Sequence, residues 1–189
     1  MFFRLIYLRD YIAATEIKNV FLWIIKILVV IIVGFLVTIA LGKVTIMQDG
    51  SMSPTLLVGD VTLTNRFSYQ LGEPARGDII AFKLSDDKMA STHIKRVIGL
   101  PGETIQIVDG QILIDGEVYT EQMPFPVIEN PGIAEDEIEL DNGEYFVLGD
   151  NRNSSEDSRF VDVGIIDKKD IVGKIWFIVS PKERMGFIK

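Results

Sequence analysis

Cysteine is absent from this chain of 189 residues, and histidine occurs once, as His93. Without cysteine the chain has no disulfide, no thiolate zinc site and no cysteine nucleophile. A single histidine also excludes any mechanism that needs a cluster of histidines. Basic clusters of the kind that bind nucleic acid are missing as well, and the formal net charge is −8. We therefore expect no DNA or RNA partner.

The apolar residues are concentrated near the N-terminus. Hydrophobic residues make up 48% of the chain, yet 24% are charged, which is too many for a protein with several membrane spans. The run from Phe21 to Gly42 carries one charge, Lys26. As a helix it would be about 33 Å long, and a bilayer core is about 30 Å thick. We predict an uncleaved transmembrane anchor over residues 20–42, with a buried core helix and a cleavable secretory signal as the alternatives.

The charges that flank this run predict its orientation. Residues 1–26 carry four basic and two acidic side chains, whereas Lys43 is the only charge directly after the run. The positive-inside rule then places residues 1–19 in the cytoplasm and residues 43–189 outside the cell membrane. The protein is accordingly predicted to cross the membrane once.

Residues 43–189 have the pattern of a mainly β domain. Short runs rich in β-branched and aromatic residues alternate with turns, and no long helical period follows residue 43. Asp109-Gly110 predicts a tight hairpin, and Asp115-Gly116 a second turn. The runs that we predict as strands are Val44–Met47, Val61–Asn65, Asp78–Phe82, Ile94–Ile98, Thr104–Val108, Gln111–Ile114, Tyr145–Leu148 and Ile175–Val179. The expected fold is an antiparallel, coiled, barrel-like β domain.

An acidic insert interrupts this domain. No lysine or arginine occurs between Arg96 and Arg152, and the same stretch holds thirteen acidic residues, six of them from Glu135 to Glu144. We interpret residues 103–145, approximately, as a solvated β subdomain inserted into the scaffold. A metal site is the alternative, but the glycine-centred spacing of an EF-hand loop is missing, so no metal is predicted.

A chain with these absences has few possible nucleophiles. Serine or threonine remains, and a hydroxyl needs a base, which here is His93 or a lysine whose pKa burial has lowered. Ser51 follows Gly50 in a turn directly after a predicted strand, where its hydroxyl and backbone N–H could face outward. A plain loop rich in glycine, serine and proline is the alternative interpretation.

The candidate bases lie on one predicted strand. Strand alternation places His93 and Lys95 on one face and Ile94 and Arg96 on the other. A solvated lysine at a sheet edge and a structural imidazole are the simpler interpretations of the two residues.

Taken together, four segments resemble the conserved boxes of the type I signal peptidases, and they occur in the family's order. They are Ser51–Leu56, Arg76–Phe82, Lys95–Glu103 and Gly149–Arg159, and they follow an N-terminal span. The resemblance extends over about residues 20–180. It implies a membrane-bound serine endopeptidase that cleaves N-terminal signal peptides from secreted preproteins with a Ser-Lys dyad.

The resemblance also implies a role for individual residues. Ser51 would be the nucleophile, with its backbone amide as an oxyanion donor, and Lys95 the general base. Ser155 would hydrogen-bond the lysine amine, and Gly149 would leave room beside it. The remaining supporting positions are Met52, beside the nucleophile, and Asp150, Asp157, Arg96 and Arg159, which form ion pairs in the family. Arg76 and Asp78 lie in a structural box, where we expect packing and pairing.

The family likewise implies the partners. Substrates would be preproteins with small residues at −1 and −3 of the cleavage site, met at the membrane lipid and close to the secretion translocon. No cofactor is implied. The alternatives are a peptidase of this fold dedicated to one substrate, such as a pilin, and a non-catalytic, membrane-anchored binding relative. A self-cleaving repressor with a related site is disfavoured, since it would need a DNA-binding segment.

Two positions depart from the family pattern. Asp49 stands where some members use a serine hydroxyl as the second oxyanion donor, and an ionised carboxylate can only accept. We expect Asp49 to turn away from the site, rather than to be protonated there or to leave the oxyanion to backbone donors alone. His93 replaces an aromatic residue and is a candidate modulator of Lys95.

Overall fold

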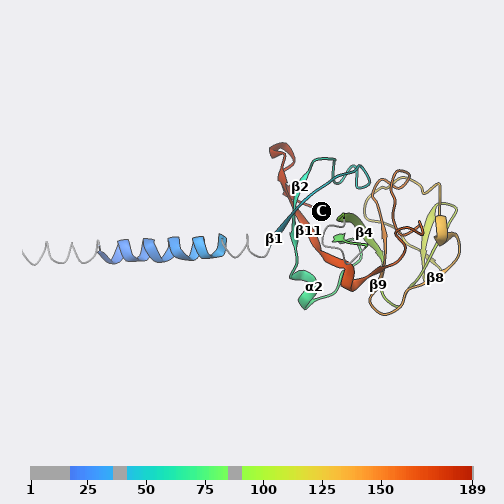
Figure 1. The fold of residues 1–189 in the computed structure, drawn as a ribbon, viewed down its shortest axis with the longest axis horizontal. Helices are drawn as coiled ribbons and strands as arrows, with labels where there is room; N and C mark the ends of the chain where they lie inside the picture. Colours follow the sequence, from blue (N-terminus) through green and yellow to red (C-terminus); the bar gives the residue numbers. More distant parts are fainter. Residues whose placement is uncertain (1–17, 36–41, 85–90, 189) are drawn as a thin grey trace, which may run out of the picture. The chain divides into compact units, whose positions relative to one another are not determined.

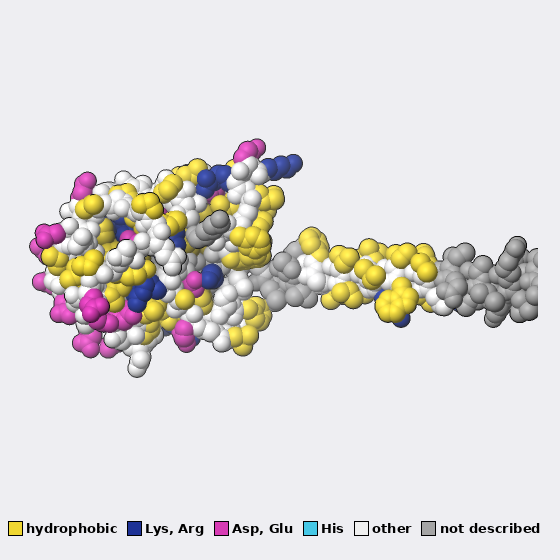
Figure 2. Space-filling model, turned by 180° about the vertical axis from the view of Figure 1, so that it is seen from behind, with side chains coloured by type: hydrophobic (Ala, Val, Ile, Leu, Met, Phe, Trp, Pro, Cys, Tyr) yellow, Lys and Arg dark blue, Asp and Glu magenta, His cyan; other side chains and the backbone are white. Residues whose placement is uncertain are grey.

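The computed structural model describes residues 18–35, 42–84 and 91–188. The chain divides into two compact units, residues 1–41 and residues 42–189 (Figure 1). In the first unit a helix over Lys18–Phe35 is long and apolar enough to cross a membrane, and none of its apolar window is buried. Figure 2 shows hydrophobic side chains along its length. Most of the predicted cytoplasmic segment (1–19) and the end of the predicted span (36–41) lie outside the described residues.

The second unit is built on a curled antiparallel sheet in the order β1-β2-β11-β3-β4-β9-β10, with β12 paired to β11. The strands are β1 (Gly42–Ile46), β2 (Val61–Asn65), β3 (Ile79–Phe82), β4 (His93–Gly99), β9 (Glu144–Leu148), β10 (Ile166–Asp167), β11 (Ile171–Ser180) and β12 (Gly186–Phe187). The register of β11 shifts against both β2 and β3. Such irregularities bend and twist a strand, which accounts for the curl of the sheet. The predicted fold class, a mainly β domain of coiled, barrel-like form after an apolar helix, is confirmed.

The acidic insert folds as a separate four-stranded sheet, in the order β7-β6-β5-β8. Its strands are β5 (Thr104–Val108), β6 (Gln111–Ile114), β7 (Glu117–Val118) and β8 (Ile138–Glu139). Asp109 and Gly110 both have positive φ, as do Asp115 and Gly116, the pattern of tight two-residue hairpins. Figure 2 shows acidic side chains gathered at this end of the domain.

The eight predicted strands are all present, within two residues at each end, except that β11 begins four residues earlier than predicted. The short strands β7, β8, β10 and β12 were not predicted. Short helices complete the domain: α2 (Ser68–Leu71), η1 (Gly132–Glu135), η2 (Lys168–Asp170) and η3 (Lys182–Arg184).

Three buried clusters hold the sheets together, and one of them positions the site. Met52 and Leu56, from the loop after β1, pack with Ile94 of β4 and with Met47 and Ile175. Met52 and Leu56 are fully buried, so the loop that carries Ser51 is anchored by apolar side chains immediately after the serine.

Candidate active site

The loop that carries Ser51 is held by backbone hydrogen bonds on both sides. Within the loop, the Ser53 N–H donates to the Gly50 carbonyl, and the Leu56 N–H donates to the Met52 carbonyl. From the segment after β9, the Asn151 N–H donates to the Ser51 carbonyl at 2.9 Å. The backbone around the serine is thereby fixed by hydrogen bonds within the loop and by one hydrogen bond from the segment after β9.

Lys95 faces Ser51 from the middle of β4. Its side chain is buried, with 2% of its surface exposed, and Nζ lies 2.6 Å from Ser51 Oγ in a hydrogen bond. Burial lowers the pKa of Lys95, and the charge of Arg159 acts in the same direction, whereas the charges of Asp49, Asp157 and Glu156 act against it. A lysine in this position loses its proton more easily than one in water.

The two side chains open into a cleft of about 440 Å³. Its lining consists of Asp49, Gly50, Ser51, His93, Lys95, Ser154, Ser155 and Glu156. His93 and Lys95 both reach it, as strand alternation predicts. The His93 ring stacks on Phe82 with centroids 5.6 Å apart, and burial together with the charge of Lys95 lowers its pKa. In the described parts of the chain, no three acidic or histidine side chains come together as metal ligands would.

Asp49 does not turn away from the site, so that expectation is wrong. Its Oδ1 accepts the backbone N–H of Ser51 at 2.8 Å. Burial alone would raise the pKa of Asp49, but hydrogen bonding to Ser51 and the charges of Lys95 and His93 outweigh it, and the net pKa lies below its ordinary value. The carboxylate is therefore ionised at neutral pH, which also argues against the protonated form. An aspartate two residues before a backbone N–H readily forms such a turn, and this local signal could have predicted the contact.

Ser155 also differs from expectation. Its hydroxyl is buried in the wall of the cleft, but no described residue forms a hydrogen bond with it, so the predicted bond to the Lys95 amine is absent. Gly149 packs against this serine: a Cβ added to Gly149 would lie 2.1 Å from Ser155 Oγ and 2.6 Å from the Ser51 carbonyl oxygen. The room that Gly149 leaves is thus beside Ser155 and the Ser51 backbone.

Gly149→Ala is expected to lower the activity of the site by at least about tenfold, because a misplacement of about 1 Å at reacting groups already costs a large factor. The Ser155 hydroxyl can rotate, but the Ser51 carbonyl can yield only if the nucleophile loop shifts. Gly186→Ala is a matched control, since a Cβ there meets nothing within 4 Å and β12 does not line the cleft. Thermal unfolding and the rate of cleavage should be measured for both variants. Wild-type cleavage by Gly149→Ala would show that the loop is not fixed as described.

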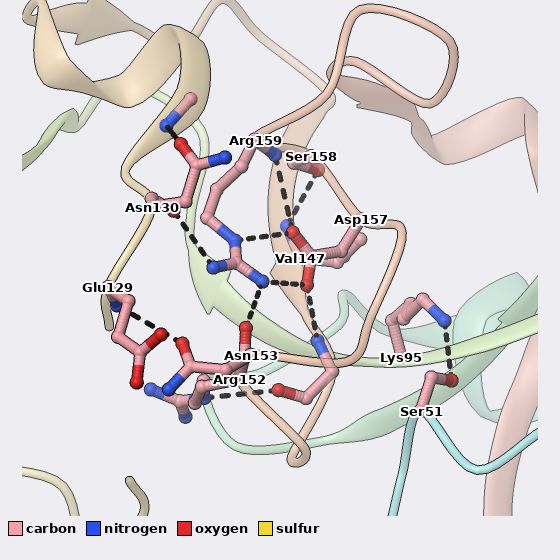
Figure 3. A network of polar contacts seen from close by, with 12 residues as sticks. Ser51, Lys95, Glu129, Asn130, Val147, Arg152, Asn153, Asp157, Ser158 and Arg159 are labelled. Carbon is pink, nitrogen blue, oxygen red and sulfur yellow. Dashed lines mark hydrogen bonds and ion pairs between the residues drawn. The ribbon is translucent and has the colours of Figure 1, made fainter. Parts of the chain in front are cut away.

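The predicted ion pairs lie beside Ser51 and Lys95. Asp157 and Arg159 are both buried, with Arg159 Nε donating to Asp157 Oδ1 at 2.8 Å. Asp157 Oδ2 also accepts the Gly149 N–H. Figure 3 shows this network beside Ser51 and Lys95. Asp157 thus engages a cation other than Lys95, which leaves the lysine amine free to act on Ser51.

A second pair fixes the other side of the segment. Arg96 donates from Nε and Nη2 to the two carboxylate oxygens of Asp150, both at 2.7 Å. Because Arg96 follows Lys95 on β4, this bidentate contact ties the strand of the base to the segment that holds Ser155. Arg76 and Asp78, as expected, form pairs elsewhere, with Glu103 and Lys174.

One group of contacts was missed by the sequence analysis. Arg152 is buried and pairs with Glu121 of the acidic insert. The ring of Phe125 lies over its guanidinium, 4.3 Å from the ring centroid. These partners come from a loop about thirty residues away, and nothing in their spacing along the chain signals the contact.

Comparison with known proteins decides the family. The model of the family described as signal peptidase, peptidase S26, matches residues 20–180. The chain belongs to this family. Signal peptidase I P of Bacillus subtilis subsp. natto is 34% identical over 182 residues, which cover 91% of this chain and 95% of that protein. Signal peptidase I of Leptolyngbya laminosa is 36% identical over 169 residues, or 82% and 79% of the two chains. A crystal structure of a signal peptidase I from Enterococcus faecalis is 30% identical, with a TM-score of 0.42, and covers 55% of this chain and 97% of that one.

The matched residues include most of the apolar helix, Ser51, Lys95 and both buried ion pairs. Family membership therefore applies to the part of the chain that carries the geometry described above. It makes the chain a membrane-anchored serine peptidase.

Proposed function

We propose that Ser51 and Lys95 form the dyad with which this enzyme cleaves signal peptides from secreted preproteins. The observation that carries the assignment is the 2.6 Å contact between Lys95 Nζ and Ser51 Oγ. A buried lysine with a lowered pKa can be neutral near physiological pH, and only a neutral amine accepts the proton of a serine hydroxyl.

The reaction follows from this pair. As Ser51 Oγ bonds to the scissile carbonyl carbon, its proton passes to Lys95 Nζ and the carbonyl oxygen becomes an oxyanion. The backbone N–H of Ser51, which belongs to the nucleophile itself, is assigned as a donor to that oxyanion. Collapse of the intermediate breaks the C–N bond, and the Lys95 ammonium gives its proton to the leaving amine. Lys95 then takes a proton from the water whose oxygen bonds to the acyl carbon. The bond between that carbon and Ser51 Oγ breaks, and the Lys95 ammonium returns the proton to Oγ, which releases the carboxyl product and regenerates both residues.

The surrounding residues are assigned supporting roles. The pair of Asp150 with Arg96 holds the segment that begins at Gly149 against β4. The pair of Asp157 with Arg159 holds that segment together, since Asp157 accepts the Gly149 N–H. Met52 anchors the nucleophile loop in the core. No cofactor takes part in the proposed mechanism.

We also propose a membrane topology and a substrate preference. Basic residues before the apolar helix favour a cytoplasmic N-terminus, with residues 43–189 on the extracytoplasmic side. The anchor keeps the site at the lipid surface, where a signal peptide emerging from the translocon is embedded, and so raises the effective concentration of substrate. Small residues at −1 and −3 are the preference that the family implies.

Cleavage of a panel of preproteins by the full-length protein in detergent tests the proposal. We expect the wild type to trim those with Ala-x-Ala before the cut, and Ser51→Ala to be slower by about 10⁴-fold or more. Ser68→Ala is the matched control, because it makes the same chemical change on α2, which does not line the cleft.

Three outcomes would contradict the proposal in different ways. Trimming by Ser51→Ala at the wild-type rate would overturn the assignment of the nucleophile. Cleavage of a single member of the panel would favour a peptidase with a dedicated substrate. Failure of the folded wild type to cleave any preprotein would favour a non-catalytic relative.

A further inference from the structure

The oxyanion donor of this enzyme is already occupied in the structure. Asp49 Oδ1 accepts the Ser51 N–H at 2.8 Å, and both residues line the cleft. A backbone N–H donates one good hydrogen bond, along one direction. The oxygen of a bound scissile carbonyl needs that same hydrogen, so it and the Asp49 carboxylate compete for one position.

We propose that Asp49 is a displaceable plug of the oxyanion hole. In the resting enzyme its carboxylate holds the Ser51 N–H, and a peptide activates the site by displacing it. The proposal rests on the roles of Ser51 and Lys95 given above, and it adds a residue that holds the resting enzyme back.

The charges around Asp49 explain why it occupies the hole. Lys95 and His93 face it from β4, and Glu156 faces the same cleft from the segment after β9. The two basic groups favour the ionised carboxylate, and an ionised carboxylate makes a stronger hydrogen bond with an N–H than a neutral carbonyl does. A serine hydroxyl at this position could donate to the oxyanion, whereas the carboxylate can only repel it.

Displacement makes activation depend on how the substrate binds. A peptide that fills the cleft on both sides of the bond gains binding free energy, and part of that energy can move the carboxylate away. A short or poorly held peptide gains too little to do so. The plug therefore slows the turnover of short peptides more than the turnover of embedded preproteins.

Three substitutions at Asp49 separate the effect of the plug from that of the charge. Asp49→Ala removes the competing acceptor, Asp49→Asn keeps an acceptor without the charge, and Asp49→Ser adds a hydroxyl donor. Glu156→Gln is the matched control: it removes another carboxylate whose charge raises the pKa of Lys95, but no hydrogen bond joins that carboxylate to the Ser51 N–H.

Rates of preprotein cleavage from pH 6 to 10 give the first readout. We expect Asp49→Ala to raise the plateau of kcat/KM by about tenfold, and Asp49→Ser by about 10²-fold, the size of effect of one oxyanion donor. Asp49→Asn should lie between the wild type and Asp49→Ala. Glu156→Gln should move the acid limb of the profile towards lower pH without the rise in the plateau that Asp49→Ala shows.

Affinity for a peptide aldehyde ending in Ala-x-Ala gives a second readout that does not need turnover. Its reversible hemiacetal with Ser51 places an oxygen in the hole, so Asp49→Ala and Asp49→Ser should bind it at least about tenfold more tightly. Lower plateau rates and weaker aldehyde binding in folded Asp49→Ala would overturn the plug and make Asp49 a positioning residue of the loop. If wild type and Asp49 variants bind the aldehyde alike and none cleaves, the proposed function and the plug both fail. If the aldehyde binds more tightly to Asp49→Ala but no preprotein is cleaved, only the substrate assignment fails.

Discussion

Lys95→Met is expected to lower the rate of preprotein cleavage by about 10⁴-fold while raising the stability of the enzyme. The loss of activity follows because the substitution removes the amine that is hydrogen-bonded to Ser51 Oγ and that is assigned as its base. The gain in stability follows because a buried amine, which water would solvate well in the unfolded chain, is replaced by an apolar side chain of similar length. We expect the free energy of unfolding to rise by about 1 kcal/mol or more. In a domain of this size, each kcal/mol raises the unfolding temperature by roughly 2–4 °C.

The pH dependence of that gain has a definite sign. Since burial places the pKa of Lys95 below its value in the unfolded chain, which is about 10.4, the unfolded state binds more protons between the two values. The stability of the wild type therefore rises with pH until about 10.4. Methionine does not titrate, so the advantage of Lys95→Met should be largest near pH 7 and should shrink towards pH 10.

Unfolding temperatures of both proteins at pH 7, 8, 9 and 10 check this expectation, with cleavage rates measured on the same samples. A constant difference across the series would mean that Lys95 titrates in the fold as it does in water. In that case the lysine would be protonated at neutral pH, and another base would have to act on Ser51.

Much of the scaffold could be predicted because its signals are local. Alternating β-branched residues mark the strands, and Asp109-Gly110 and Asp115-Gly116 adopt the positive φ angles that their composition favours. Ser51 and Lys95 could be proposed as a dyad because the absence of cysteine leaves few kinds of nucleophile and because their segments match those of a family. The pairing of Asp157 with Arg159 is likewise local, since a single residue separates the partners.

The contacts that could not be predicted depend on distant segments or on a choice between rotamers. Glu121 and Phe125 reach Arg152 only because the insert folds back on the segment after β9. The Asp49 carboxylate could have turned away from the site or towards Ser51. The basic side chains on β4, Lys95 and His93, favour the position against Ser51. The Ser155 hydroxyl lies beside Gly149, buried without a described hydrogen-bond partner, and no local signal in the sequence indicates this rotamer.

Arg159→Met is expected to cost about 3–5 kcal/mol of stability, because it leaves the carboxylate of Asp157 buried without its cation. Asp157 is fully buried and Arg159 is 2% exposed. Arg159 also donates to the carbonyls of Asn130 and Arg152, so two backbone acceptors lose their donor at the same time. The unfolding temperature should fall by about 6–20 °C.

The same variant should change the pH profile of the enzyme that remains folded. The charge of Arg159 lowers the pKa of Lys95, and that of Asp157 raises it. With the arginine gone, the pKa of Lys95 rises and the acid limb of kcat/KM moves to higher pH, a shift that a purely structural defect would not produce.

Two comparisons separate the buried charge from the loss of a side chain. Asp157→Asn combined with Arg159→Met removes both charges but keeps an oxygen for the Gly149 N–H, so it should recover much of the stability and bring the acid limb back. Lys168→Met breaks an exposed pair with Glu73 and should cost about 1 kcal/mol at most. If the double variant were as unstable as Arg159→Met, the cost would lie in the lost donors to Asn130 and Arg152. The pair would then hold the segment in place by its backbone contacts, and the unpaired charge of Asp157 would have little part in the loss.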